Sequence, residues 1–153
     1  MQIKQVEVLL VEDDPADVEL TQIAFERAQL LVPLNVVNDG EEALAYLRQE
    51  GEYANAVKPD LILLDLNLPG INGRQVLETI KSDENLKPIP VIILTTSQSD
   101  EEILRSYNLG ASAYVTKPVG MEGFMKVVKS LDCFWFTVVK FPPHGSSSFG
   151  YKP

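Results

Sequence analysis

Four short apolar runs, separated by stretches with helical spacing, constrain the fold of this chain more than any other feature of its sequence. These runs are Val6–Val11, Leu61–Leu64, Val91–Leu94 and Ala113–Val115, and a further short run, Leu34–Val37, lies between the first two. Apolar runs that alternate with helices are typical of repeated βα units and of a parallel sheet. Because βα crossovers are right-handed, we expect a three-layer α/β fold, in which a doubly wound five-stranded parallel sheet carries helices on both faces.

The expected helices fill the intervals between the apolar runs. The first begins after Asp14, a good N-cap residue, and has Pro15 at its first helical position. The expected spans are 15–29, 41–49, 74–82, 100–108 and 120–140. The run LILLD does not alternate between apolar and polar residues, which predicts a central strand that is buried on both faces.

Polar residues stand where the expected strands end. Glu12 and Asp13 follow the first strand, Asp65 the central one and Thr95 the next, and Lys117 comes just after the last. Because the carboxyl ends of parallel strands meet at one edge of a sheet, we expect these side chains to lie close together. Three carboxylates, one hydroxyl and one ammonium group would then share one site. Such a cluster requires a cation and suits chemistry at a phosphoryl group.

Length, charge and composition exclude several classes of protein. A chain of 153 residues fits one domain with a short appendage, and a formal net charge of −9 argues against binding nucleic acid. No apolar stretch is long enough to span a membrane, and the N-terminus lacks the pattern of a signal peptide. The single cysteine, Cys133, and the single histidine, His144, exclude an intramolecular disulfide and a Cys/His zinc site. We therefore expect a cytoplasmic protein.

Four segments of the chain resemble the receiver domain of two-component response regulators. They are LLVEDD, LILLDLNLPGING, VIILTT and GASAYVTKP, which occur in this order across residues 6–132. The resemblance implies a flavodoxin-like doubly wound fold. It also implies Mg²⁺-dependent phosphorylation of an aspartate by a sensor histidine kinase.

The resemblance assigns a role to each residue of the acidic site. It implies that Asp65 is the phosphoacceptor and that Lys117 pairs first with Asp65 and then with the phosphoryl group. It implies that Mg²⁺, or Mn²⁺ as a substitute, is bound by Asp13, by Asp65 and by the backbone carbonyl of Asn67, with Glu12 acting through water. Oxygen ligands of this kind are those that Mg²⁺ prefers.

The resemblance also implies a set of phosphoryl contacts and a conformational switch. The hydroxyl of Thr95 and the backbone N–H groups of Leu66 and Thr96 would donate to phosphoryl oxygens. Movement of Thr95 would leave space that the ring of Tyr114 can fill. A plain packing role is the competing explanation for Tyr114.

After the receiver segments the chain keeps an apolar helical stripe. We expect a receiver domain at 1–132, an apolar extension of the last helix at 133–143 and a flexible tail at 144–153. The stripe includes the expected dimer contacts Phe134, Trp135, Val138 and Val139. Two alternatives stay open: the stretch FWFTVV also suits a β-strand, and the stripe also suits packing within one chain.

The start VEDDPADVELT and the ending FWFTVVKFPP most resemble those of the small response regulators paired with cyanobacterial phytochromes. The resemblance implies a stand-alone regulator that assists its own phosphorylation and dephosphorylation, with a phytochrome as its kinase. A phosphatase of the haloacid-dehalogenase type is a second hypothesis. That chemistry needs another aspartate two residues after the nucleophile, where this chain has Asn67. A third hypothesis, a pseudo-receiver that is never phosphorylated, conflicts with the complete set of polar residues.

Overall fold

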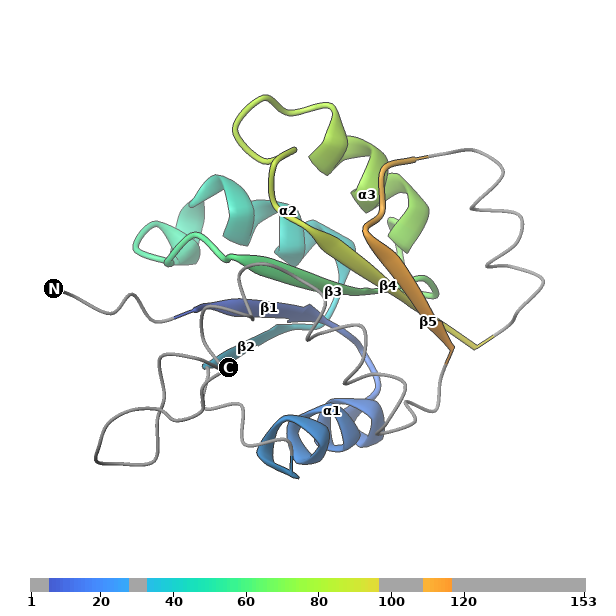
Figure 1. The fold of residues 1–153 in the computed structure, drawn as a ribbon. Coiled ribbons are helices and arrows are strands. Elements are labelled where there is room, and N and C mark those ends of the chain that lie inside the picture. The colour runs from blue at the N-terminus through green and yellow to red at the C-terminus, as the bar shows by residue number, and fades with distance from the viewer. Residues whose placement is uncertain (1–5, 28–32, 97–108, 117–153) are drawn as a thin grey trace, which may run out of the picture.

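The described part of the chain folds around one parallel sheet. The structure is a computed structural model that describes residues 6–27, 33–96 and 109–116. Its five strands lie in the order β2-β1-β3-β4-β5, and every neighbouring pair is parallel (Figure 1). The strands are β1 (Val8–Val11), β2 (Leu34–Val37), β3 (Leu61–Asp65), β4 (Val91–Thr95) and β5 (Ala113–Thr116).

Helices cover both faces of this sheet. The described helices are α1 (Pro15–Arg27), α2 (Gly40–Arg48), α3 (Gly73–Lys81) and the short 3-10 helix η1 (Gly51–Tyr53). Helix α1 lies on one face, and α2 and α3 lie on the other (Figure 1). The three-layer, doubly wound fold predicted from the sequence is thereby confirmed. The helices expected at 100–108 and 120–140 lie outside the described residues.

The core has two parts, one on each side of the central strand. Ile62 and Leu64 of β3 face the side of α2 and α3, where Leu77 is also buried. Leu61 and Leu63 face the opposite side, where Phe25 of α1 packs. Burying a large aliphatic side chain contributes about 1.5–3 kcal/mol, so this strand supplies a large share of the stability of the fold. None of the helices in the described ranges has both the length and the apolarity that crossing a bilayer requires.

Short polar residues begin the helices at the carboxyl edge of the sheet. The Oδ1 of Asp39 accepts from the N–H of Glu42 at 2.8 Å and caps α2. Asn72 caps α3, and its side chain and that of Gln75 form a reciprocal capping box. Asp14, the predicted cap of α1, accepts from the N–H of Ala16 at 2.9 Å. These caps place three helix N-termini beside the ends of β1, β2 and β3.

Candidate functional site

The register of the sheet brings the predicted acidic residues together. Val11 of β1 pairs with Leu64 of β3, so Glu12 and Asp65 both lie one step beyond this pair on neighbouring strands. Asp65 in turn pairs with Leu94 of β4, which puts Thr95 one step further along the same edge. The predicted meeting of these residues at the carboxyl edge follows from parallel pairing alone.

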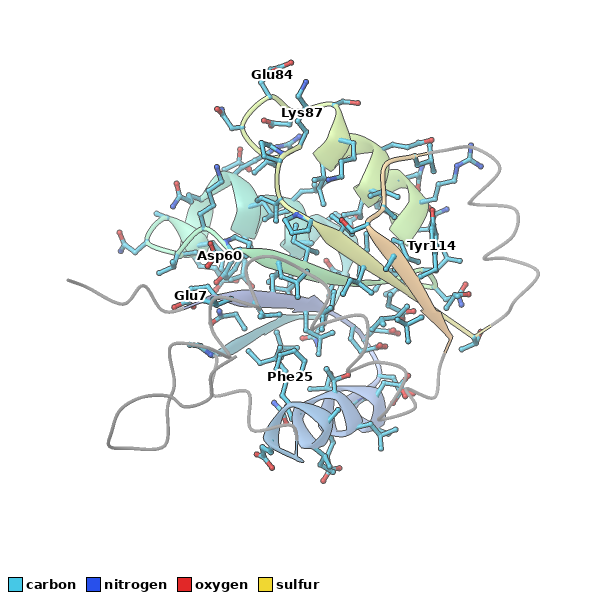
Figure 2. The ribbon with its side chains drawn as sticks, viewed as in Figure 1. Glu7, Phe25, Asp60, Glu84, Lys87 and Tyr114 are labelled. Atoms are coloured by element: carbon cyan, nitrogen blue, oxygen red, sulfur yellow. The ribbon has the colours of Figure 1, made fainter. Side chains whose placement is uncertain are left out.

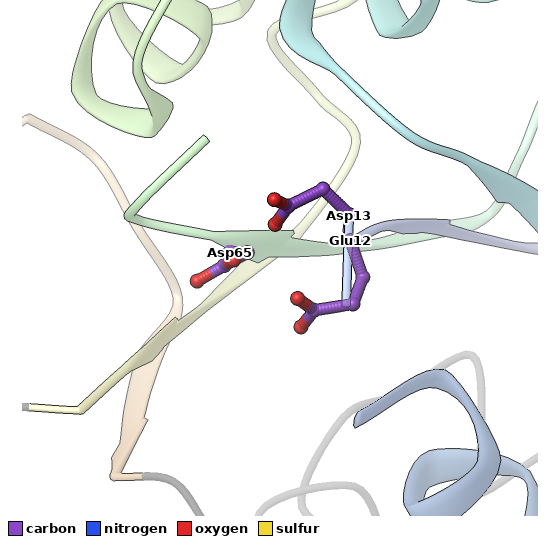
Figure 3. Close-up of side chains that lie close together, drawn as sticks. All are labelled: Glu12, Asp13 and Asp65. Atoms are coloured by element: carbon purple, nitrogen blue, oxygen red, sulfur yellow. The ribbon is translucent and has the colours of Figure 1, made fainter. Parts of the chain in front are cut away.

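Three carboxylates form a compact cluster at this edge. Glu12, Asp13 and Asp65 each offer an oxygen, and these oxygens all lie within 4.8 Å of one another (Figure 3). Glu12 and Asp65 are buried, with exposed fractions of 0% and 2%, whereas Asp13 is exposed. Carboxylates about 5 Å apart repel each other by roughly 3 kcal/mol per pair at an effective dielectric constant of about 20. The donors that the described residues bring together here are all oxygens, a set that fits Mg²⁺ or Mn²⁺ and not a soft metal ion.

Backbone hydrogen bonds orient two of these carboxylates. The Oε2 of Glu12 accepts from the N–H of Asp14 at 3.3 Å, and the N–H of Glu12 donates to the carbonyl of Val37 at 3.0 Å. The Oδ1 of Asp65 accepts from the N–H of Asn67 at 3.2 Å. An aspartate side chain that accepts a hydrogen bond from the N–H two residues later forms an Asx turn. Aspartate favours this turn, so the sequence could have indicated it. The N–H of Asn67 is therefore a contact to Asp65 that sequence reasoning missed.

The loop between β3 and α3 closes tightly against Asp65. The N–H of Gly73 donates to the carbonyl of Leu66 at 3.0 Å. A Cβ at position 73 would overlap the carbonyl oxygen of Asp65 and would lie 2.7 Å from the Cα of Leu66. Only glycine allows this approach without movement of the backbone. The first turn of α3 thus packs directly against the backbone of Asp65, the predicted phosphoacceptor.

The predicted phosphoryl contacts lie at the same edge in different environments. Thr95 is fully buried, and Thr96 is exposed. The N–H of Leu66 donates to the carbonyl of Leu94 at 2.8 Å, so a phosphoryl oxygen would have to share or replace this bond. Lys117 lies outside the described residues.

Tyr114, the predicted switch residue, lies on β5 at the end of the sheet (Figure 2). It pairs with Ile93 of β4, is half-buried and packs against the core on the side of α2 and α3. This position agrees with the packing role and with the switch role alike. The four expected dimer contacts, at positions 134, 135, 138 and 139, lie outside the described residues.

Comparison with known proteins adds an independent line of argument. The profile of the family described as the response regulator receiver domain matches residues 8–129. Over 135 residues the chain is 42% identical to response regulator Rcp1 of Synechocystis sp., a match that covers 88% of this chain and 92% of Rcp1.

Solved structures of phytochrome response regulators are similar to this one. The bacteriophytochrome response regulator RtBRR has a TM-score of 0.83 at 44% identity, over 94% of this chain and 87% of RtBRR. The phosphorylated cyanobacterial phytochrome response regulator RcpA has a TM-score of 0.74 at 46% identity, over 92% of this chain and 100% of RcpA. The Mn²⁺-bound form of Rcp1 has a TM-score of 0.72 at 41% identity, over 90% of this chain and 99% of that one. The chain therefore belongs to the response regulator receiver family, the family that its four motifs predicted.

Proposed function

We propose that this response regulator accepts a phosphoryl group on Asp65 from a sensor histidine kinase. The observation that carries the proposal is a buried carboxylate at the end of the central strand, with the oxygens of Glu12 and Asp13 within 4.8 Å. A carboxylate oxygen of Asp65 attacks the phosphorus of a phosphohistidine, the P–N bond breaks, and the histidine keeps the electron pair. The product on this chain is an acyl phosphate.

The cluster suits the divalent cation that this family uses. We propose that Asp13, Asp65 and the backbone carbonyl of Asn67 hold Mg²⁺, with Glu12 acting through water and Mn²⁺ as a substitute. When bound, the cation would offset the charge of the carboxylates and of the incoming phosphoryl oxygens. The all-oxygen donor set supports this assignment, as does the Mn²⁺-bound form of the related Rcp1.

Neutral and cationic donors complete the proposed site. The hydroxyl of Thr95 and the N–H groups of Leu66 and Thr96 donate to phosphoryl oxygens, and the ammonium group of Lys117 pairs with them. These groups act by position and charge, which is most of what phosphoryl transfer needs. The protein thereby assists its own phosphorylation and dephosphorylation. It lacks a second aspartate at position 67 with which a phosphatase would turn over external substrates.

Phosphorylation would change the surface of the protein through the packing of side chains next to the site. Thr95 and Tyr114 lie on the neighbouring strands β4 and β5, and Tyr114 is half-buried. Movement of Thr95 toward the phosphoryl group would let the ring of Tyr114 turn inward and would change the surface beside β5.

We further propose a phytochrome as the kinase and a second copy of the chain as a partner. The first proposal is supported by the names of RtBRR and RcpA, which are phytochrome response regulators. The second assigns residues 1–132 to a cytoplasmic receiver, residues 133–143 to a dimer contact and residues 144–153 to a tail. Sedimentation of the full chain and of Trp135→Ala tests it, because loss of this indole should shift a dimer toward monomer.

Two aspartates at opposite ends of β3 provide the test of phosphorylation. With Mg²⁺ and acetyl phosphate, intact-mass measurement should find one phosphoryl group on the wild type and on Asp60→Asn, and none on Asp65→Asn. A chelator should abolish labelling of the wild type and of Asp60→Asn. Equal labelling of Asp65→Asn and the wild type would refute the assignment.

A further inference from the structure

Asn38 makes an unusual contact to the backbone of the acidic pair. Its Nδ2 donates to the carbonyl oxygen of Glu12 at 3.2 Å, in a partly buried bond between residues 26 positions apart. The N–H of Glu12 donates to the carbonyl of Val37 at 3.0 Å. The two polar backbone groups of Glu12 are thus both bonded to consecutive residues at the end of β2. The side chain of Asn38 extends the pairing of β1 with β2 by one bond beyond the last strand residue.

This bond acts on the peptide that joins two of the three carboxylate residues. The carbonyl of Glu12 belongs to the same planar peptide group as the N–H of Asp13, so a bond that holds the carbonyl also holds the start of Asp13. Glu12 is fully buried and Asp13 is exposed. Burial already restrains the side chain of Glu12. The exposed carboxylate of Asp13 depends more on the direction of its backbone.

Asn38 is itself anchored to α2. Its N–H donates to the Oε1 of Glu42 at 3.1 Å, and the N–H of Glu42 donates to the Oδ1 of Asp39 at 2.8 Å. The turn between β2 and α2 is therefore tied to the first turn of the helix. Because a carbonyl oxygen only accepts hydrogen bonds, the amide nitrogen of Asn38 must face Glu12.

We propose that Asn38 is a positioning residue of the metal site. Through the carbonyl of Glu12 it directs the carboxylate of Asp13 toward that of Asp65, and so raises the affinity for a divalent cation. Asn38 contacts neither a phosphoryl group nor a carboxylate of the cluster in this role. The inference rests on the proposed function, since it requires that the three carboxylates bind a metal ion. Hydrogen bonds that orient metal ligands commonly change metal affinity when they are removed.

A second asparagine on the same strand provides a matched control. Asn35 of β2 also donates from Nδ2 to a β1 carbonyl, that of Val8 at 3.4 Å, but at the opposite edge of the sheet. We would titrate the full chain with Mn²⁺ alone and follow free Mn²⁺ by electron paramagnetic resonance. Asn38→Ala should bind Mn²⁺ about three to ten times more weakly than the wild type, the range for one lost hydrogen bond. Asn35→Ala should bind as the wild type does. Urea unfolding in chelator should give Asn35→Ala a loss of stability at least as large as that of Asn38→Ala, because Asn35 also donates to the Oε1 of Glu7 at 3.2 Å.

Three outcomes would overturn the proposal. If Asn38→Ala binds Mn²⁺ as tightly as the wild type, the side chain does not position the site. If both variants lose affinity equally, the effect is one of general stability. If the wild type itself binds no Mn²⁺, the metal site fails together with this inference, whereas the first two outcomes leave the metal site standing.

Discussion

The strands begin at one edge of the sheet, the amino edge, and end at the other, the carboxyl edge. The two edges contain the same residue types but use them for different purposes. At the amino edge, carboxylates and backbone groups bond to each other: the N–H of Glu7 donates to the Oδ2 of Asp60 at 2.9 Å, and the N–H of Asp60 donates to the carbonyl of Glu7 at 2.7 Å. These two residues lie side by side (Figure 2). At the carboxyl edge, three carboxylates face one another within 4.8 Å.

The comparison separates residues that stabilise the fold from residues that serve the site. At the amino edge, the Oε1 of Glu7 accepts from the Nδ2 of Asn35 at 3.2 Å, so its charge meets a donor. At the carboxyl edge, Asp65 accepts from Asn67 and faces two further carboxylates. Concentrated like charge costs stability, and a protein retains it where a ligand needs it. The amino edge serves the fold, and the carboxyl edge is where we propose that a cation and a phosphoryl group bind.

The largest expected effect comes from forcing the carboxyl edge apart. In Gly73→Ala the new methyl group meets the backbone of Asp65 and Leu66, which cannot move aside cheaply. Overpacking of this kind costs about 1–3 kcal/mol, and alanine's better helix propensity offsets at most about 1 kcal/mol of it. Gly51→Ala is the control: nothing lies within 4 Å of an added Cβ there, but the left-handed φ of 59° strains an alanine by about 1–2 kcal/mol. Both variants should lose stability in urea unfolding, but only Gly73→Ala should also be phosphorylated more weakly. Equal phosphorylation of the two variants would contradict the close approach.

A smaller effect, of opposite sign at the two edges, should follow from removing one charge. In chelator at low salt, Asp13→Asn should stabilise the protein by about 1 kcal/mol, because it relieves repulsion at an exposed position. Asp60→Asn should destabilise it by about 1 kcal/mol, since a bond from an N–H to a charged oxygen becomes one to a neutral oxygen.

Salt and metal serve as controls on this pair. Added salt should shrink the gain in Asp13→Asn through screening. Added Mg²⁺ should reverse it, because the wild type then gains stability from binding. If the two variants changed in the same direction in chelator, the contrast between the edges would be wrong.

The fold and the acidic site were predictable from the sequence because they depend on local patterns. The buried run LILLD identifies β3, and the parallel direction of the strands brings Glu12, Asp13 and Asp65 to one edge. Helix η1 was not predicted. It depends on a left-handed Gly51, at φ 59°, and on contact between the rings of Tyr46 and Tyr53, whose centroids are 5.3 Å apart. Neither the backbone conformation of Gly51 nor the contact between the two tyrosines produces a periodic pattern in the sequence.

The close approach of Gly73 and the bond from Asn38 escaped prediction for a related reason. Each depends on how far one element extends relative to its neighbour. Gly73, at the start of α3, lies against the end of β3, and Asn38, just after β2, donates to the residue just after β1. The apolar pattern locates the strands, but it does not give their register to the single residue. Contacts at the ends of elements therefore require the structure.

The smallest expected effect is a pH dependence at the amino edge. Lys81, at the end of α3, donates from Nζ to the carbonyls of Lys87 and Ile89 at 2.9 and 2.8 Å. Burial lowers the pKa of this amine below its ordinary 10.5. Between the lowered pKa and 10.5 the unfolded chain binds more protons than the folded one, so this group makes stability rise with pH. In Lys81→Met that contribution is absent.

Tyrosines at the same edge act in the opposite direction, which is why the variant must be compared with the wild type at each pH. Burial, followed by the charge of Glu7, raises the pKa of Tyr46 above 10.0. The unfolded chain then loses this proton first, and stability falls as pH rises through that window. Because both proteins contain Tyr46, its contribution cancels in the difference between their unfolding free energies. As the pH approaches 10.5, the wild type should become more stable relative to Lys81→Met. A difference that stays constant with pH would mean that the fold does not desolvate the charge of Lys81.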